Sequence, residues 1–449
     1  MGKLFGTDGV RGIANRDLTP ELAYQLGRIG AYVLNKDNNK RAKVAIGKDT
    51  RISGDLLESA MTAGFLSMGV DVISLGVLPT PAVAYLTRHL KADFGVVISA
   101  SHNPAEYNGI KFFNREGYKL PDEVEEQIEA YILNNRDVDI RMEGKDVGTV
   151  TVDEKSIEEY TDFLKTTLDR DFKGLKIAVD AGNGAAYRSA PKLLKELGAE
   201  VILINDTPDG MNINKGCGST NPEVIGALVK EVGADIGISF DGDADRLIAV
   251  DENGEVVDGD HIMAICGICL KKQGKLKNDV IVGTVMSNIG LEIAMKEYGC
   301  NVVKTKVGDR YVLEEMVQGG YCLGGEQSGH VIFLDYNTTG DGLLTAIQLI
   351  ATMKAENKKL SELAKVMTSY PQVLVNAKVK NENKEVYQND AIIMQSITAI
   401  ENKLAGEGRV LIRPSGTEPL VRVMLEGKNQ EELNVLATDL AKLIEQRLN

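Results

Sequence analysis

Apolar positions from residue 42 onward fall into two alternating patterns. Short, nearly continuous apolar runs are separated by longer segments in which apolar residues recur every three or four positions. The first pattern is typical of buried strands and the second of amphipathic helices, so the chain predicts an α/β fold with parallel strands. Predicted strands lie at 42–49, 71–76, 94–100, 175–182, 200–205, 234–240, 279–287, 301–309 and 321–329, and predicted helices at 53–69, 82–90, 187–198, 222–233, 260–274, 290–299, 310–318 and 342–355.

The pattern changes after residue 371. Strands at 371–380, 409–416 and 420–427 are grouped with helices at 391–406 and 431–448, which is typical of a small α+β domain. Before it, one plan recurs three times, in VVISA-SHNP, IGISF-DGDAD and YCLGG-EQSG: a strand, a polar loop and a second strand. We therefore predict three similar α/β domains with mixed sheets and a C-terminal α+β domain, at 1–155, 156–254, 255–368 and 369–449. The polar passage 122–161 is interpreted as a linker with helical segments.

Length and charge narrow the function classes. A chain of 449 residues exceeds what one hydrophobic core supports. A net charge of −14 argues against nucleic acid or an anionic membrane as partner. The five cysteines are an odd number scattered along the chain, and no apolar run reaches the roughly 18 residues of a membrane span, so we expect a reducing, cytoplasmic setting. Cys266 and Cys269 are interpreted as helix core rather than a zinc or redox site.

The stretch 94–104, FGVVISASHNP, places Ser101 at the carboxyl end of a strand, where open α/β sheets build their sites. Alone, it also fits a corner in which polar side chains satisfy local backbone groups. If residues 107–114 return as a strand, Lys111 comes back toward the serine hydroxyl. Arg11, in FGTDGVRG, is either a site cation or a solvated surface residue, and Ser53, near Arg51, is a predicted helix N-cap.

The loop DGDADR carries the strongest chemical signal. Asp241, Asp243 and Asp245 alternate, so an extended segment turns three carboxylates to one side, which calls for a hard cation such as Mg²⁺. A calcium EF-hand is disfavoured because Arg246 stands where that loop needs glycine. The remaining alternative is a solvated acidic turn.

Two further loops suggest recognition of a polar, phosphorylated ligand. GGEQSGH offers hydrogen-bonding groups for a polyhydroxylated ligand, and its histidine can transfer a proton near neutral pH; the residues are Glu326, Gln327, Ser328 and His330. RPSGTEP combines cations, hydroxyls and turn amides in the manner of a phosphate nest, with Arg413, Ser415, Gly416, Thr417 and the following Arg422. Each loop alone also fits a structural role.

At SASHNP, DGDADR, GGEQSGH and RPSGTEP, in that order, the whole chain resembles the α-D-phosphohexomutase superfamily. The resemblance implies a heart-shaped enzyme of four domains around a central cleft. Ser101 would be a phosphoserine and would bind one Mg²⁺ per chain together with Asp241, Asp243 and Asp245. It also implies proton transfer by Lys111 and His330, active-site arginines at Arg11 and Arg246, sugar binding by Glu326, Gln327 and Ser328, and phosphate binding by Arg413, Ser415, Gly416, Thr417 and Arg422.

The implied reaction converts glucosamine 6-phosphate to glucosamine 1-phosphate, with glucosamine 1,6-bisphosphate as intermediate and activator, on the route to UDP-N-acetylglucosamine and cell-wall precursors. The choice of glucosamine depends mainly on Gln327, because relatives acting on mannose or glucose phosphates resemble GEMSGH at this loop. Those sugars remain the alternative. A phosphatase, a kinase and a phosphosugar-binding regulator are the other classes. The role of Asp309 and Arg310 and the choice between monomer and homodimer stay open.

Overall fold

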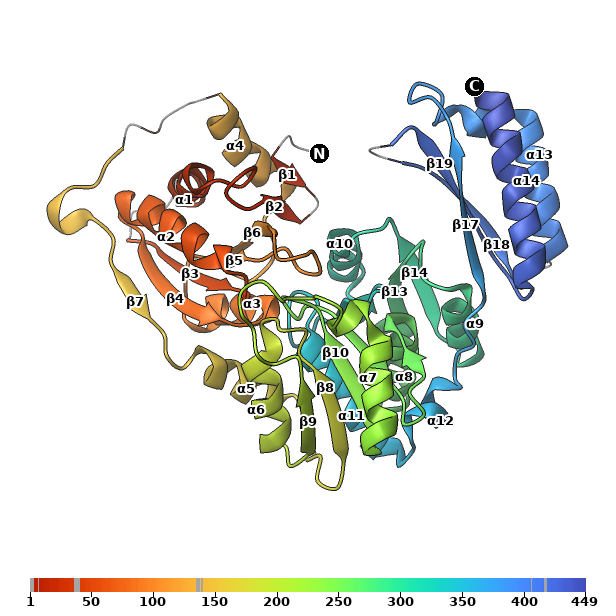
Figure 1. Ribbon diagram of the computed structural model, residues 1–449, viewed down its shortest axis with the longest axis horizontal. Helices are drawn as coiled ribbons and strands as arrows, with labels where there is room; N and C mark the ends of the chain where they lie inside the picture. Colours follow the sequence, from red (N-terminus) through yellow and green to blue (C-terminus); the bar gives the residue numbers. More distant parts are fainter. Residues whose placement is uncertain are drawn as a thin grey trace. The chain divides into compact units, whose positions relative to one another are not determined.

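The computed structural model describes residues 4–6, 8–35, 41–134, 138, 140–404, 406–415 and 418–449 (Figure 1). The chain forms two compact units. The first comprises residues 1–286 and 300–366, and the second residues 287–299 and 367–449. Among the described helices, none is both long and apolar enough to cross a membrane.

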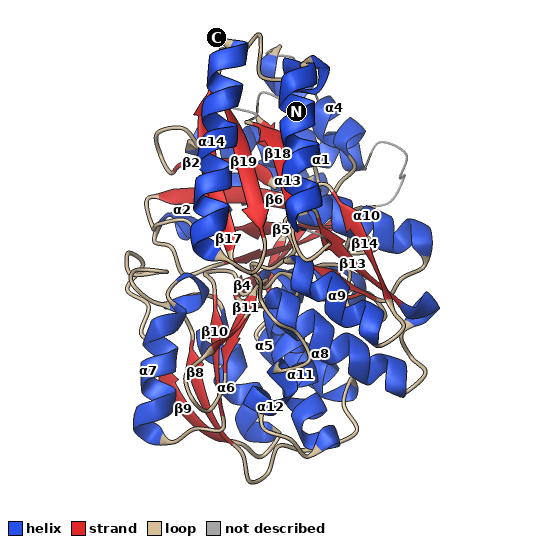
Figure 2. Ribbon diagram, turned by 90° about the vertical axis from the view of Figure 1, so that its right-hand side faces the viewer, coloured by secondary structure: helices blue, strands red, loops and turns tan. Residues whose placement is uncertain are grey.

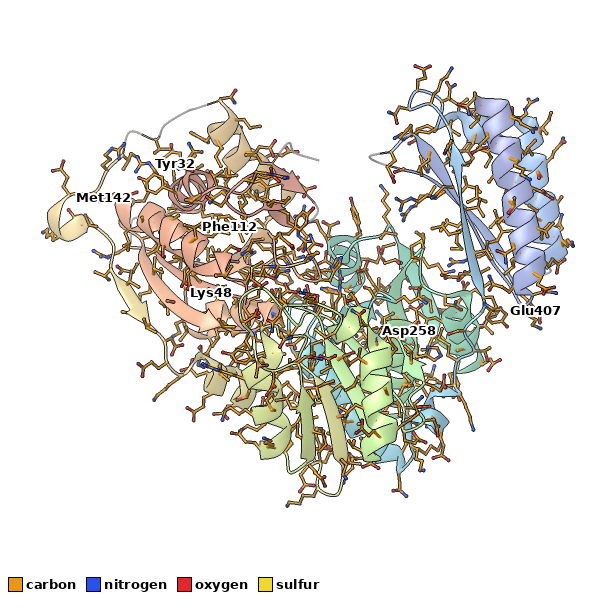
Figure 3. All side chains as sticks on the ribbon, viewed as in Figure 1. Tyr32, Lys48, Phe112, Met142, Asp258 and Glu407 are labelled. Atoms are coloured by element: carbon orange, nitrogen blue, oxygen red, sulfur yellow. The ribbon has the colours of Figure 1, made fainter. Side chains whose placement is uncertain are left out.

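The first sheet has seven strands in the order β1-β2-β6-β5-β3-β4-β7. Its strands are β1 (Phe5–Gly6), β2 (Gly9–Ile13), β3 (Lys43–Lys48), β4 (Asp71–Val77), β5 (Phe94–Ile98), β6 (Tyr107–Asn114) and β7 (Val150–Val152), and its helices are α1 (Pro20–Leu34), α2 (Ser53–Ser67), α3 (Thr80–His89) and α4 (Asp122–Leu133). Phe112 of β6 is buried toward α1, where Gly30 leaves room for its ring (Figure 3).

The second sheet has the order β12-β11-β10-β8-β9 and the third the order β14-β13-β15-β16. Both are mixed, as predicted. The second group consists of α5 (Ser156–Thr166), β8 (Lys176–Asp180), α6 (Ala186–Glu196), β9 (Glu200–Ile204), α7 (Pro222–Val232), β10 (Ile236–Phe240), β11 (Leu247–Val250) and β12 (Val256–Val257). The third consists of α8 (Gly259–Lys272), β13 (Val280–Thr284), β14 (Asn301–Thr305), α10 (Asp309–Gly319), β15 (Leu323–Gly325), β16 (Val331–Phe333), α11 (Gly342–Glu356) and α12 (Leu360–Ala364).

The repeated strand-loop-strand plan is confirmed. β5 pairs antiparallel with β6, β10 with β11 and β15 with β16. Each polar loop singled out from the sequence therefore connects two neighbouring antiparallel strands. This geometry returns the chain beside the strand that it has just left, so residues on both strands reach the same end of the sheet.

The second unit contains β17 (Gln372–Lys378), β18 (Arg409–Pro414) and β19 (Leu420–Glu426) in the order β17-β19-β18, all antiparallel. Helices α13 (Ala391–Leu404) and α14 (Gln430–Leu448) cover one face of this sheet (Figure 2). Their apolar faces and the sheet enclose a separate core. The predicted α+β grouping is confirmed. Helix α9 (Ile289–Glu297) belongs to the same unit although strands of the third sheet flank it in sequence.

Two sequence interpretations are corrected. The passage 122–161 is not a linker throughout, because β7 forms an edge strand of the first sheet and α4 contributes Ile128 to the core of that sheet. Ser53 is not an N-cap. Ile52 holds the cap position with helical backbone angles, so Ser53 lies inside the first turn, and its hydroxyl accepts a hydrogen bond from Asn108. The second sheet also extends to β12, two to three residues beyond the predicted boundary at 254.

Candidate active site

Ser101 lies in the loop between β5 and β6 and is buried. Its backbone adopts φ 51°, a left-handed conformation that residues other than glycine rarely adopt. The surrounding structure holds it there: Arg51 and Asn214 donate to its carbonyl at 3.2 and 2.9 Å. The Ser101 Oγ donates to Asp241 at 2.6 Å. A strained serine aimed at a carboxylate is typical of a functional site rather than of a simple loop corner.

Asp241, Asp243 and Asp245 come together as predicted, but the segment is not extended: Ala244 has φ 54° and its backbone N–H donates to the Asp241 carbonyl at 3.1 Å, so a turn gathers the carboxylates. All three are buried, and one oxygen of each lies within 4.8 Å of the others. Burial, followed by the neighbouring carboxylates, raises the pKa of Asp241 well above its ordinary value and also raises that of Asp245. Among the described residues, one oxygen of Asp243 and one of Asp245 has no hydrogen-bond partner. Unpaired carboxylate oxygens this close together fit a hard divalent cation with oxygen ligands, such as Mg²⁺.

Lys111 returns toward the serine as predicted, because β6 runs antiparallel to β5 with Lys111 opposite Val97. Its Nζ lies 3.0 Å from Asp243, 3.0 Å from Asp8 and 3.9 Å from Asp245. Burial alone would lower the pKa of Lys111, but these carboxylates outweigh it and raise the pKa above its usual value. Lys111 is therefore a charged ammonium beside the acidic loop.

Two arginines flank this centre. Arg11 pairs with Asp8, and Arg246 donates to the Nδ1 of His102 at 2.7 Å. Burial lowers the pKa of His102 to about 4, and Arg246 and Arg11 act in the same direction. His102 is thus a neutral acceptor that holds the Arg246 guanidinium next to Ser101, since arginine can only donate.

The loop after β15 brings His330 to the acidic loop. Its Nε2 lies 4.0 Å from Asp245 and 3.6 Å from Asp309. Gly329 makes the approach possible: its φ is 94°, and an added Cβ would lie 2.1 Å from the carbonyl oxygen of Leu247. The backbone N–H of Leu247 also donates to the Gly329 carbonyl at 3.0 Å.

The other polar residues of this loop are placed differently. Glu326 accepts from the backbone N–H of Gly308 at 3.2 Å, and Ser328 is exposed. The Gln327 amide donates to Asp258 at 3.1 Å, the residue that also caps α8. The side chain on which the glucosamine prediction depends is therefore oriented by Asp258.

Sequence reasoning missed several residues of the centre. Asp8 contacts Lys111, and Thr80 donates to Asp243 at 2.7 Å. Lys119 bridges Asp8, at 2.5 Å, and Asp309. Asp8 stands within FGTDGVRG, three positions before Arg11, which was a usable signal. Thr80 and Lys119 carry no signal in the sequence, because their partners come from other sheets or distant loops.

The fourth predicted loop belongs to the second unit. Arg413 of β18 lies directly opposite Arg422 of β19, and like charges in such a pair repel. Arg422 pairs with Glu418 at 3.3 Å, whereas Arg413 has no ion-pair partner among the described residues. Lys384, not predicted, donates to the Ser415 carbonyl. The basic side chains outnumber the carboxylates here, which favours binding of an anion such as phosphate. Gly416 and Thr417 lie outside the described residues.

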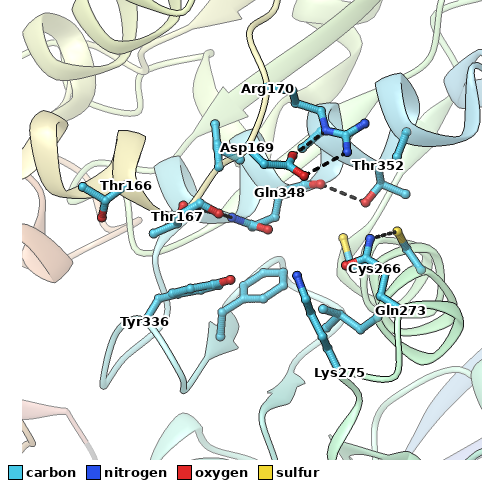
Figure 4. A pocket seen from close by; sticks show the side chains of 16 residues that line it. Thr166, Thr167, Asp169, Arg170, Cys266, Gln273, Lys275, Tyr336, Gln348 and Thr352 are labelled. Carbon is cyan, nitrogen blue, oxygen red and sulfur yellow. Dashed lines mark hydrogen bonds and ion pairs between the residues drawn. The ribbon is translucent and has the colours of Figure 1, made fainter.

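A cavity of about 630 Å³ lies elsewhere in the first unit, between the segment after α5 and helices α8 and α11 (Figure 4). Several of its polar side chains pair with one another. Asp169 pairs with Arg170 at 2.8 Å, and the Gln348 amide donates to Thr167 at 3.0 Å. Cys269, on its wall, accepts from Gln273 and is buried in α8 with Cys266, as predicted. This cavity therefore has no part in the chemistry proposed below.

Comparisons with known proteins identify the family of this chain. Four matches cover the phosphoglucomutase/phosphomannomutase alpha/beta/alpha domains I, II and III and the C-terminal domain, at residues 2–139, 158–254, 258–370 and 374–443. The chain belongs to this family and is an isomerase of the α-D-phosphohexomutase superfamily. A relative from Alkaliphilus metalliredigens, 71% identical over 100% of both chains, is named phosphoglucosamine mutase.

Solved structures share the fold. A phosphoglucomutase/phosphomannomutase family protein from Burkholderia thailandensis is 24% identical, with a TM-score of 0.82 over 100% of this chain and 99% of that one. An Aspergillus fumigatus N-acetylphosphoglucosamine mutase, solved with GlcNAc-6P and magnesium, is 17% identical, with a TM-score of 0.70 over 100% of this chain and 96% of that one.

Proposed function

We infer that this protein is a phosphoglucosamine mutase, which interconverts glucosamine 6-phosphate and glucosamine 1-phosphate. The observation that carries the mechanism is the Ser101 Oγ, 2.6 Å from Asp241 within a buried group of three carboxylates. A serine hydroxyl in this setting suits a group that is esterified with phosphate and gives it away again. Relatives that match over their full length are named phosphoglucosamine mutase, which supports glucosamine phosphate as the substrate.

The proposed reaction has two transfers. Phosphorylated Ser101 gives its phosphoryl group to the free hydroxyl of the bound sugar phosphate, which forms glucosamine 1,6-bisphosphate and leaves the serine hydroxyl free. After the bisphosphate has reversed its orientation, the serine oxygen takes the other phosphoryl group. The sugar leaves as the isomeric monophosphate, and the enzyme is phosphorylated again, so no phosphate is lost. The bisphosphate also serves as activator, because it phosphorylates an empty serine.

Asp241, Asp243 and Asp245 would hold one Mg²⁺ per chain, together with the serine phosphate. The ion supplies positive charge that offsets the negative charge of the transferring phosphoryl group. Thr80 fixes the orientation of Asp243, and the backbone N–H of Arg246 donates to Asp241 at 3.2 Å. These contacts hold the carboxylates in place before the ion binds.

The remaining side chains bind the phosphorylated sugar and transfer protons. Lys111, Arg11 and Arg246 supply positive charge for the phosphoryl oxygens, and we propose that Lys111 and His330 serve the proton transfers at the sugar hydroxyl. Glu326, Gln327 and Ser328 bind sugar hydroxyls. Arg413, Ser415, Gly416, Thr417 and Arg422 hold the phosphate that is not transferred. We propose four domains close to the boundaries predicted from the sequence, with the second extended to residue 257 by β12. We also propose a cytoplasmic setting, which five free, buried cysteines suit.

The test combines intact-mass measurement with turnover. Purified protein should carry one phosphate, and Ser101→Ala should carry none. This variant should lose at least 1,000-fold in rate, because loss of a covalent nucleophile can cost about a million-fold. Normal turnover by Ser101→Ala would contradict the mechanism. Rates on glucosamine, glucose and mannose phosphates decide the sugar, and faster turnover of mannose 1-phosphate would contradict the choice of glucosamine. Steady release of free phosphate would indicate a phosphatase.

A further inference from the structure

Six ionisable side chains at the proposed site form a closed ring of ion pairs. Carboxylates alternate with basic groups, and every neighbouring pair lies within ion-pair distance. Going round the ring, the residues are Asp8, Lys111, Asp245, His330, Asp309 and Lys119. They come from the N-terminal segment, from β6 and the loop after it, from the acidic loop, from the loop after β15 and from the first residue of α10. The ring therefore joins segments of all three sheets of the first unit.

His330 is confined within this ring. A Cβ added to Gly340 would lie 2.4 Å from the imidazole Nε2, so the backbone of Gly340 packs directly against the imidazole of His330. The same Nε2 faces Asp309 at 3.6 Å and Asp245 at 4.0 Å. Neither imidazole nitrogen has a hydrogen-bond partner among the described residues. Packing on one side and two carboxylates on the other therefore determine where the imidazole lies.

The two carboxylates are not equivalent. Asp245 is one of the three proposed cation ligands, so its charge is shared with the ion once that ion binds. Asp309 lies outside that group and is held by Lys119. Burial works against ionisation, but Lys119 and then His330 keep the pKa of Asp309 below its ordinary value. Asp309 is thus the carboxylate that remains available to His330.

We propose that Asp309 is a positioning residue that acts through His330, with Lys119 holding its carboxylate in place. The inference rests on the proposed function, because it deepens the role given there to His330. It accounts for the position in KVGDRYV that the sequence left open. Asp309 binds neither the sugar nor the cation in this proposal, and its effect reaches the substrate only through the imidazole.

The neighbouring Arg310 provides a matched control. Its guanidinium pairs with Glu125 at 2.9 Å and with Asp122, at the start of α4, and also donates to the carbonyl of Leu120 at 3.4 Å. Asp309 and Arg310 therefore both tie α10 to the segment 119–125, but only Asp309 contacts His330. A variant of Arg310 weakens the same attachment and leaves the imidazole contacts intact.

The experiment is a double-mutant cycle on kcat, with melting temperatures measured for every variant. His330→Gln should lose about 100-fold or more, in the range for a proton-transfer group. Asp309→Asn should lose about 10-fold in kcat with a KM within a factor of about three of the wild type, and Asp309→Glu should recover part of the loss. Arg310→Gln should lower the melting temperature at least as much and change kcat less than about threefold. In the His330→Gln background, Asp309→Asn should cost almost nothing further.

Two results would overturn the proposal. One is equal loss of kcat in Asp309→Asn and Arg310→Gln, which would make Asp309 a structural attachment only. The other is independent loss, in which the effects of His330→Gln and Asp309→Asn multiply. If Asp309→Asn does not fold, Asp309→Glu takes its place in the cycle with the same two criteria. Wild-type turnover of glucosamine phosphate is measured first, so failure of the proposed function is seen separately as an inactive wild type.

Discussion

The hydroxyl of Ser101 donates a 2.6 Å hydrogen bond to Asp241, a residue 140 positions further along the chain. The two residues stand in equivalent places of two repeats, each in the loop between antiparallel strands. A second contact supports this one, since the backbone N–H of Thr80 donates to the Asp243 carbonyl at 2.9 Å. The first two sheets therefore present their loops to each other, and the chemistry depends on that alignment.

The left-handed backbone of Ser101 predicts an unusual result for a conservative change. Ser101→Thr keeps the hydroxyl, but a left-handed backbone costs a residue with a Cβ about 1–2 kcal/mol, and a β-branched side chain fits φ 51° less well than serine does. We expect Ser101→Thr to lower both the melting temperature and the rate, whereas Ser101→Gly keeps or raises the melting temperature and loses turnover. Thermal unfolding with turnover assays checks this. A Ser101→Thr variant as stable as the wild type would show that the loop relaxes freely.

Thr80 provides a prediction about the cation. Its hydroxyl donates to Asp243 at 2.7 Å, so Thr80→Val removes the bond at nearly constant volume. We expect weaker binding of Mg²⁺ by roughly tenfold, which is typical when an outer partner of a ligand is lost. Activity titrated with Mg²⁺ measures this. Thr87→Val is the control, because Thr87 is also buried in α3 and its hydroxyl donates, among the described residues, only to the Val83 carbonyl. Equal Mg²⁺ dependence in the two variants would contradict the role of Thr80.

The loop that carries Ser101 and the acidic loop approach each other closely at Gly242. A Cβ added there would lie 2.5 Å from the carbonyl oxygen of Ser101 and 2.9 Å from the Asn214 amide. Gly242→Ala must push the two loops apart, so we expect at least a tenfold loss of kcat, because displacements near 1 Å cost about 100-fold. Gly427→Ala, in the second unit, controls for an added methyl group, because Gly427 has no left-handed backbone and a Cβ there would come no closer than 3.3 Å to a neighbouring side chain. Similar kcat values in both variants would count against close alignment of the loops.

Removal of the cation should be visible without substrate. Three buried carboxylates repel one another, so a bound divalent ion stabilises the folded chain. Mg²⁺ at about 100 times its Kd adds about 2.7 kcal/mol, which raises the melting temperature by a few degrees. EDTA should reverse the rise, and Asp241→Asn should reduce it. An identical Mg²⁺ response in wild type and Asp241→Asn would place the effect at another site.

The sequence predicted most strands and helices because their apolar periods are regular and glycines or prolines end them. It also predicted the acidic group, but for a reason that the structure corrects: Asp241, Asp243 and Asp245 meet because the loop turns, with φ 54° at Ala244, and not because the segment is extended. The return of Lys111 required only that β6 be antiparallel to β5.

Other features depended on three-dimensional neighbours and left no trace in local pattern. Lys119 follows the turn after β6, and its partners Asp8 and Asp309 are 111 and 190 positions away. Ser53 resembled a helix N-cap because serine is among the preferred residues at that position. In the fold, the Asn108 amide lies close to it and donates to its hydroxyl. Long-range hydrogen bonds and ion pairs of this kind decide the details of the site, whereas local periodicity decides its scaffold.

Away from the site, Asp71 predicts how the first sheet responds to acid. A hydrogen bond from Arg41 lowers the pKa of Asp71 to about 2, and Thr149 also donates to it through its backbone N–H and its hydroxyl, each at 2.8 Å. An unfolded aspartate has a pKa of about 3.9, so this group contributes stability above that pH and loses it as the pH falls through about 2. Arg41 is exposed and Asp71 is only partly buried, so the contribution of the pair is about 1 kcal/mol or less.

Asp71→Asn keeps an acceptor for Thr149 but removes the charge. Urea unfolding midpoints measured between pH 6 and pH 2 should fall less steeply for Asp71→Asn than for the wild type below about pH 4, because the variant has no carboxylate to protonate there. Hydrogen exchange should meanwhile increase at residues 150–152, since the edge strand β7 is held next to this contact. The same acid dependence in both proteins would mean that Arg41 and Asp71 do not stabilise this edge of the sheet.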